Sequence, residues 1–430
     1  MNKLIPFLFF IAFLSACRAN DENKVLQEVA FKDGVLTEIH IEKISPEIQQ
    51  IKLSELLEEF RFIPLETNEK CLISNTKIHF SEDFILVGTQ NFPGTARLYR
   101  FDNNGNFIDE IGTAGRGPGE NEGESIEVIH YCEEDNTILA KWTGRNDNPQ
   151  LYHNSGKLLF EIQKPENLPW HHFRDIYSWD DSIWFSSGSI AGPNIMSFRD
   201  SVALIFYNKD GEILRRIPRK SYPPDRGYSP VGWNSSVYRY DNQWRLYMHG
   251  NDTVFNLADM NLIPYAVLVS GTDAYPYNQS ITPEQLIGKY YLNILAETPN
   301  NWFINKTTTN EANVREFAPG QWGGQYSGES QLIIVDKKSM DAITVQLTDD
   351  IFNFIPEEYL SMGLLEWQDN RVYFALPPYL LKDLIEDINI NNITNETAKR
   401  VIEKIKYIPV DDNPVVFYFA LKEGFEIPVR

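Results

Sequence analysis

The sequence has 430 residues and a formal net charge of −21 at pH 7. This acidic excess argues against nucleic acid as a partner, because phosphates demand a basic surface, and against binding of anionic lipid through the protein surface. Aromatic residues make up 13% of the chain, and 25 glycines and 24 prolines are spread along it. This composition is typical of many short strands joined by turns.

The first residues are typical of an export signal. Lys3 precedes a short apolar run at 4–13, which is followed by Leu14-Ser15-Ala16-Cys17. The run is too short to span a bilayer and has the length of a signal-peptide core. The segment resembles a bacterial lipobox, which implies that residues 1–16 are removed. Cys17 would then carry a lipid that holds the protein to a membrane without spanning it.

Residues 17–50 are predicted to be a tether between the lipid and the folded domain. The acidic pair Asp21-Glu22 resembles the surface-export signal of Bacteroidetes lipoproteins, but such pairs are also common in an acidic chain. The expected location is therefore the outer membrane, with both the periplasm-facing and the cell-surface orientation left open.

Residues 51–430 are predicted to form one all-β domain built from a repeat. Six times, an alternating apolar segment meets an Asp- or Asn-rich turn and then a second strand-like run, at 77–88, 128–142, 174–188, 236–250, 292–306 and 363–377. Asn and Asp tolerate the left-handed backbone of tight turns, so each segment indicates a β-hairpin. A third apolar run follows every hairpin and a fourth follows five of them. Four antiparallel strands per unit predict a six-bladed β-propeller.

The sixth unit lacks a fourth strand, and the sequence leaves two ways to complete it. Residues 60–65 form a strand-like run before the first unit and could join the last blade. Residues 425–429 could instead turn back and supply the strand themselves. We favour the N-terminal strand. Closure matters because an open ring would expose strand edges that promote aggregation.

Four insertions interrupt the repeat. Residues 218–234 and 307–330 are predicted to be loops, and residues 279–290 a short helix. Residues 379–405 have the apolar spacing of one or two helices and lie inside the last blade. Long loops on a rigid scaffold are the usual place for binding function.

The hairpin pattern ends in segments with a family resemblance. Residues 101–107 and 111–120 resemble the blade ends of NHL-like and TolB-like six-bladed propellers. Together with residues 53–67 and 412–416, they are similar to uncharacterised six-bladed propeller lipoproteins of gut Bacteroidetes. The resemblance implies fold and compartment, and it brings no activity or catalytic residue.

Residues in the predicted loops are the candidate ligand contacts. Exposed aromatic rings beside polar groups can stack on sugars or anchor a protein, and the backbone around a Gly-flanked Arg can bind an anion. The candidates are Arg116, Trp170, His171, His172, Trp233, Trp322 and Tyr326. The alternative, which we favour, is that the loops bury their own aromatic rings and that the Gly-rich turn around Arg116 is structural.

No catalytic or metal-binding motif is visible. The seven histidines show no metal-ligand spacing, and those in predicted strands, such as His130, are expected to be packed. Acidic pairs such as Glu133-Glu134 are expected to be solvated turn residues. No cofactor is expected, although Asp102, Asp336 and Asp412 at blade ends would suit Ca²⁺ if they converged.

Cys71 and Cys132 remain after lipidation of Cys17. The compartment permits a disulfide between them, but two lone cysteines in strand-like contexts are more often small buried apolar residues, and we favour that reading.

The sequence therefore predicts a monomeric envelope lipoprotein whose propeller binds a protein or a glycan without catalysis. The alternative is an enzyme that acts on glycans, a hydrolase or a lyase, with its site at the central channel. Converging carboxylates, histidines and arginines at the channel mouth would favour the enzyme, whereas an apolar or featureless mouth would favour binding.

Overall fold

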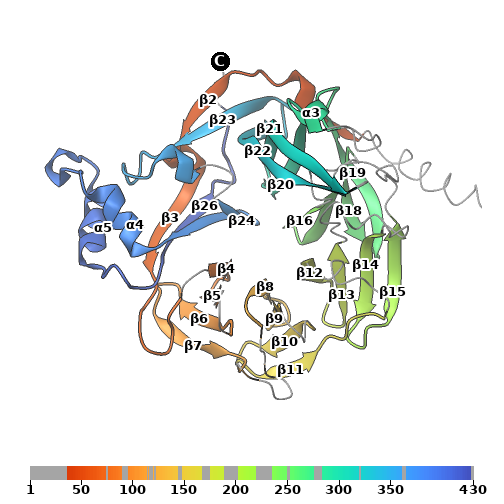
Figure 1. Ribbon diagram of the computed structural model, residues 1–430, viewed down its shortest axis with the longest axis horizontal. Coiled ribbons are helices and arrows are strands. Elements are labelled where there is room, and N and C mark those ends of the chain that lie inside the picture. The colour runs from red at the N-terminus through yellow and green to blue at the C-terminus, as the bar shows by residue number, and fades with distance from the viewer. Residues whose placement is uncertain are drawn as a thin grey trace, which may run out of the picture.

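The computed structural model describes residues 36–427 except for 74–75, 90–94, 114, 116–119, 121–122, 144–147, 167–174, 188–201, 219–234, 249–251, 276–282, 319–320 and 361–364. Six sheets, each with four antiparallel strands, stand radially around one axis (Figure 1), which confirms the predicted six-bladed β-propeller. None of the helices in this part of the chain is long and apolar enough to cross a bilayer.

The first three blades each contain four strands in chain order, with the first strand nearest the axis (Figure 1). Blade 1 contains β4 (Thr76–Phe80), β5 (Phe84–Thr89), β6 (Leu98–Asp102) and β7 (Phe107–Ile111). Blade 2 contains β8 (Ile126–Cys132), β9 (Thr137–Trp142), β10 (Gln150–His153) and β11 (Leu158–Glu161). Blade 3 contains β12 (Asp175–Ser178), β13 (Ile183–Ser187), β14 (Val202–Asn208) and β15 (Ile213–Pro218).

The other three blades each take a strand from the N-terminal part of the chain. Blade 4 contains β16 (Ser235–Tyr240), β17 (Gln243–Met248), β18 (Thr253–Ala258), β19 (Asn261–Val269) and β1 (Thr37–His40). Blade 5 contains β20 (Tyr290–Glu297), β21 (Asn301–Ala318), β22 (Gln321–Asp336), β23 (Ala342–Thr348) and β2 (Ile48–Lys52). Blade 6 contains β24 (Glu366–Gln368), β25 (Arg371–Leu376), β26 (Val415–Leu421) and β3 (Leu57–Pro64).

The turns between first and second strands have the predicted left-handed backbone in blades 2, 4 and 6. Asp241 and Asn242 have φ values of 51° and 55°, and the flanking Tyr240 and Gln243 pair directly, so the turn has two residues. Asn136 and Asp369 occupy equivalent turns with φ values of 55° and 54°. These hairpins could therefore be predicted from the Asn and Asp residues of their turns, which favour this backbone conformation.

Six hydrophobic clusters lie between neighbouring blades and hold the ring together. The cluster between blades 1 and 2 joins Leu86 and Leu98 to Ile138 and Trp142, all fully buried. The middle strands pack on both faces, and every residue of β5 is buried. Burial of both faces of each sheet is what makes the blades depend on one another.

The N-terminal strand closes the ring, as we favoured. β3 pairs antiparallel with β26, with Pro64 opposite Val415 and Phe62 opposite Phe417. Phe425, in the competing segment, is not part of a strand and is buried in the cluster between blades 5 and 6.

The predicted tether at 17–50 is wrong for its last part, because residues from Thr37 onward belong to the propeller. β1 pairs parallel with β19 at the rim of blade 4, and β2 pairs parallel with β23 at the rim of blade 5. The 3₁₀ helix η1 (Ile41–Lys43) and helix α2 (Leu53–Leu56) connect these strands to each other and to β3. Strands of four or five residues are too short for their alternation to show in the sequence. Residues 1–35 lie outside the described residues.

The predicted loop at 307–330 is also wrong, since β21 and β22 pair along almost all of it. The outer part of this hairpin extends beyond the blade, and its polar and Gly-rich sequence lacked the apolar alternation of a buried strand. Most of 218–234 lies outside the described residues.

The helical predictions are confirmed. Helix α3 (Pro283–Leu286) falls within 279–290. Between β25 and β26 lie α4 (Pro378–Ile385), η4 (Ile390–Asn392) and α5 (Glu396–Tyr407), which form the insertion in blade 6 (Figure 1). A further 3₁₀ helix, η3 (Glu357–Leu360), follows blade 5.

Gly105 sets the contact between blade 1 and the closing strand, and its replacement should destabilise the ring. Its φ is +89°, and an added Cβ would lie 2.2 Å from the backbone oxygen of Pro64. We expect Gly105→Ala to lower the free energy of unfolding by about 2 kcal/mol. Gly424→Ala is the control, because a Cβ there meets nothing within 4 Å. Equal urea midpoints for the two variants would contradict this account of closure.

Candidate functional site

A cavity of about 660 Å³ lies on the axis of the ring. Residues from the first strands of all six blades line it, and so do turns between first and second strands, at 133–134, 241–242 and 369–370. Glu133 and Glu134 are exposed turn residues, as expected, and both also line the cavity. A turn at the inner edge of a blade faces the axis as well as the solvent.

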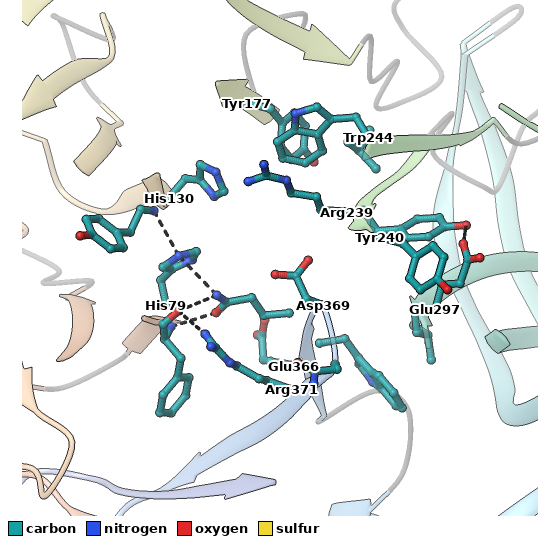
Figure 2. A pocket seen from close by; sticks show the side chains of 18 of the residues that line it. His79, His130, Tyr177, Arg239, Tyr240, Trp244, Glu297, Glu366, Asp369 and Arg371 are labelled. Atoms are coloured by element: carbon teal, nitrogen blue, oxygen red, sulfur yellow. Dashed lines mark hydrogen bonds between the residues drawn. The ribbon is translucent and has the colours of Figure 1, made fainter. Parts of the chain in front are cut away.

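His79 on β4 joins three blades at the cavity wall. Its Nε2 accepts the backbone N–H of Tyr131 from blade 2 at 3.1 Å and lies 3.3 Å from the amide nitrogen of Gln368 from blade 6 (Figure 2). Burial, reinforced by the charges of nearby basic residues, holds the pKa of His79 well below its usual value. The imidazole is therefore neutral, and its accepting nitrogen is occupied.

Blade 6 is tied to blade 1 beside His79. The side chain of Gln368 accepts from the N–H of Phe80 at 2.9 Å and donates to its carbonyl at 2.7 Å. Arg371 Nη1 donates to the same carbonyl at 3.0 Å. These bonds satisfy inner-edge backbone groups of β4 that no neighbouring strand pairs.

His130 on β8 points into the cavity (Figure 2). Its ring lies 5.3 Å from that of His79 and 5.9 Å from that of Trp244, measured between centroids. Burial, and then the charge of Arg239, lower the pKa of His130 to about 4. The prediction that His130 is packed in a strand holds, but its ring nitrogens form no hydrogen bond with the part of the chain that the structure describes.

Arg239 crosses the cavity from blade 4 to blade 2. Its Nη2 lies 2.5 Å from Oε1 of Glu134, and its guanidinium carbon lies 5.9 Å from the centroid of the Trp244 ring. The hydrogen bond from Arg239 lowers the pKa of Glu134 to about 2. The two residues form an ion pair across the cavity, in which the carboxylate is ionised.

A buried charge cluster forms the wall between blades 4 and 5. Glu297 is fully buried and accepts hydrogen bonds from Tyr238 at 3.0 Å, Tyr265 at 2.6 Å and Lys337 at 2.5 Å. Arg245 lies 3.8 Å from the same carboxylate. These contacts make the wall rigid and already occupy the carboxylate oxygens of Glu297, so this group has little capacity to bind a ligand.

Other carboxylates of the cavity are not paired. Those that form no ion pair with a described residue are Glu133, Asp241, Glu366, Asp369 and Glu423. Asp369 points toward the middle of the cavity (Figure 2). Burial raises its pKa, against the opposing charges of Arg371 and Arg239. A carboxylate whose pKa is raised in this way can bind a donor or exchange a proton.

The predicted contact residues are not among the described residues that line the cavity. Arg116, Trp170, His171, His172 and Trp233 lie outside the described residues, as does Cys17, the predicted lipidation site. Trp322 and Tyr326 belong to β22, in the part of the hairpin where only the backbone is described. These candidate contacts therefore stay predictions.

The cavity residues His79, His130, Arg239 and Asp369 were missed as a group. The usable signal was the repeat itself, because the first strand of each blade is the innermost one, and residues of this strand and of the turn after it line the axis. Comparing the first strands and turns of the six units would have included these four residues.

The described ranges contain neither a metal site nor a disulfide. No group of three or more His, Cys, Asp or Glu side chains is close enough there to hold a metal ion. Asp102 and Asp336, considered for Ca²⁺, accept backbone N–H groups within turns of separate blades. Cys71 and Cys132 are free thiols, so the disulfide alternative is wrong.

Acid should destabilise the folded ring through His79 and His130. Both are neutral in the fold, whereas in the unfolded chain they titrate near 6.5. As pH falls from 6.5 toward 4, the unfolded state binds more protons, so stability present above pH 6.5 is lost. We expect the loss in unfolding free energy between about pH 7 and about pH 4.5 to shrink in the double variant His79→Gln/His130→Gln.

The control for this prediction is His153→Gln, because His153 is exposed at the end of β10. It should show the same loss as the unmodified protein in urea denaturation at the two pH values. A double variant that loses as much stability as the control would contradict the assignment of neutral imidazoles.

Solved structures support the fold. A Bacteroides fragilis protein, provisionally described as exported, is 15% identical, with a TM-score of 0.59 over 90% of this chain and 100% of its own. A member of the DUF4221 family from Bacteroides vulgatus is 12% identical, with a TM-score of 0.46 over 85% of this chain and 97% of its own. At such identity, the first of these likenesses shows a shared fold.

Sequence comparison places the chain in a family. A search of proteins with curated descriptions found no match. The expected resemblance to uncharacterised Bacteroidetes propellers is confirmed by a family model, described as a domain of unknown function, DUF4934, which matches residues 36–420. Because the match spans most of the sequence, the chain belongs to the DUF4934 family.

Proposed function

We propose that this protein is an exported envelope lipoprotein whose propeller binds a ligand in the axial cavity without transforming it. The ligand is a glycan or a protruding group of a protein. The signal-like residues 1–16 and Cys17 support export and lipid attachment, and the exported description of the Bacteroides fragilis protein with the same fold agrees with them. We place the lipid anchor in the outer membrane.

The observation that carries the proposal is the cavity itself. Its volume of about 660 Å³ lies in the range of small-molecule sites. Strands from all six blades fix its walls, so the polar groups are held in place before a ligand arrives. Such preorganisation lowers the ordering cost of binding.

The state of the histidines favours binding over catalysis. A general base works best with a pKa near the operating pH. His130 has a pKa of about 4, and the accepting nitrogen of His79 is already occupied by a backbone N–H. Neither imidazole is suited to move a proton at neutral pH.

Filling the mouth of the cavity should abolish ligand binding. Glu133 is exposed in the turn between β8 and β9 and lines the cavity, so Glu133→Trp would place an indole in the entrance. Asp181→Trp alters the corresponding turn of blade 3, at an exposed residue that does not line the cavity, and is the matched control. We expect the full chain and the control to give the same hits on glycan and peptide arrays.

Glu133→Trp should bind the array ligands at least about tenfold more weakly, which corresponds to about 1.4 kcal/mol of binding free energy. Circular dichroism verifies that both variants remain folded. If Glu133→Trp kept every array signal, the axial cavity would not be the binding site.

A second function has a specific observation in its favour. Carboxylates, histidines and arginines do converge at the channel, which is what we expected of a glycan hydrolase or lyase there. Asp369, whose pKa burial raises, has the character of a general acid, and other carboxylates lie in the same cavity.

If the protein is such an enzyme, Asp369→Asn should eliminate turnover even at ligand concentrations that saturate the cavity. Release of new reducing ends from array-positive glycans measures hydrolysis, and formation of unsaturated sugars measures elimination. Absence of both products with the unmodified protein, on glycans that it binds, would exclude this second function.

A further inference from the structure

Resting on the proposed function, we infer that the axial cavity selects ligands that carry an organic cation, an ammonium or a guanidinium group. Three features of the cavity support this class of ligand. They are the pairing of charges in its wall, the orientation of two polar side chains, and the contacts made by the protein's own cationic groups.

The basic side chains of the cavity are already engaged. Arg239 pairs with Glu134, Arg371 donates to the carbonyl of Phe80, and Lys77 donates to the carbonyl of Glu127. By contrast, five lining carboxylates form no ion pair with a described residue, as given above. A ligand therefore meets an excess of negative charge and of hydrogen-bond acceptors.

Two side chains that point into the cavity reinforce this acceptor character. The carboxylate of Asp369 on blade 6 points into the middle of the cavity, and the ring of His130 on blade 2 points into it from another wall (Figure 2). Because His130 is neutral, one of its ring nitrogens is an acceptor, and that acceptor has no partner among the described residues. A cationic N–H donor complements both groups.

The protein's own cations show that this environment stabilises positive charge. The guanidinium of Arg239 lies over the Trp244 ring and contacts a carboxylate of another blade. In the neighbouring wall, the ammonium of Lys337 lies 4.0 Å from the centroid of Tyr240 and pairs with Glu297. Carboxylates combined with aromatic faces are the usual means of holding such groups.

The spacing of the free carboxylates favours an organic cation over a metal ion. Glu133 belongs to blade 2, Asp241 to blade 4, and Glu366 and Asp369 to blade 6. Carboxylates on separate, non-adjacent blades would contact different parts of an extended ligand, whereas a metal ion needs its oxygen ligands within about 2.6 Å of one point.

The test is calorimetric titration of the full chain with two cationic probes and their neutral counterparts. Arginine methyl ester is matched with citrulline methyl ester, and glucosamine with N-acetylglucosamine. We expect at least one cationic probe to bind at least about tenfold more tightly than its neutral counterpart. Added salt should lower the affinity for the cationic probe. Preference for the guanidinium pair indicates a peptide source, and preference for the amino sugar indicates a glycan source.

Substitutions of the lining carboxylates test where the cationic probe binds. Asp369→Asn and Glu366→Gln should each lower the affinity for the cationic probe by at least about tenfold. Glu403→Gln and Asp411→Asn, which remove exposed carboxylates from the helical insertion of blade 6, are the controls and should leave it unchanged. Binding of Ca²⁺ alone, equal affinity for charged and neutral probes, or no binding of either cationic probe would each overturn the inference.

Failure of this inference is distinguishable from failure of the proposed function. If the array yields a ligand that lacks a cationic group and Glu133→Trp abolishes its binding, the cavity is the site and only the ligand class is wrong. If Glu133→Trp leaves array binding intact, the proposed site itself is wrong.

Discussion

Burial of both faces of every sheet is the constraint on which this structure depends. A four-stranded sheet alone would expose the apolar residues of β5 or β26, and only a neighbour on each side can cover them. Six interblade clusters result, and the ring must close for the first and last sheets to be covered. The axial space is what remains when six sheets meet at their inner edges, so its contents are fixed by the same packing.

The inner edge of each blade then determines what the cavity can offer. The first strand of a blade has unpaired backbone groups toward the axis, and side chains satisfy some of them, as Gln368 and Arg371 do at Phe80. Arg239 is paired with Glu134, and Arg245 and Lys337 lie against the buried Glu297. The cavity then offers mainly acceptor groups, which supports the proposed binding role with a preference for donors.

Local signals predicted the fold well and the site poorly. Turn residues such as Asp241 and Asn242 have the backbone that their identity favours, so the hairpins could be found from the sequence. β1 and β2 were missed because they are short and are held by pairing with distant strands, and the outer part of β21 and β22 because it is polar. The cavity residues were missed for a different reason. His79, His130 and Asp369 are far apart in the chain, and nothing in their own neighbourhoods marks them as partners.

The pairing of β3 with β26 links the order of synthesis to the order of assembly. Residues near Pro64 leave the ribosome early, yet their partner near Val415 is made almost last. Until then β3 has no neighbour in its sheet, and blade 1 lacks the cover that blade 6 gives it. Such a distant contact must also overcome a large loop-closure entropy, which slows folding. If the chain is exported as we propose, it crosses the membrane before β3 and β26 have paired, so closure of the ring has to follow export.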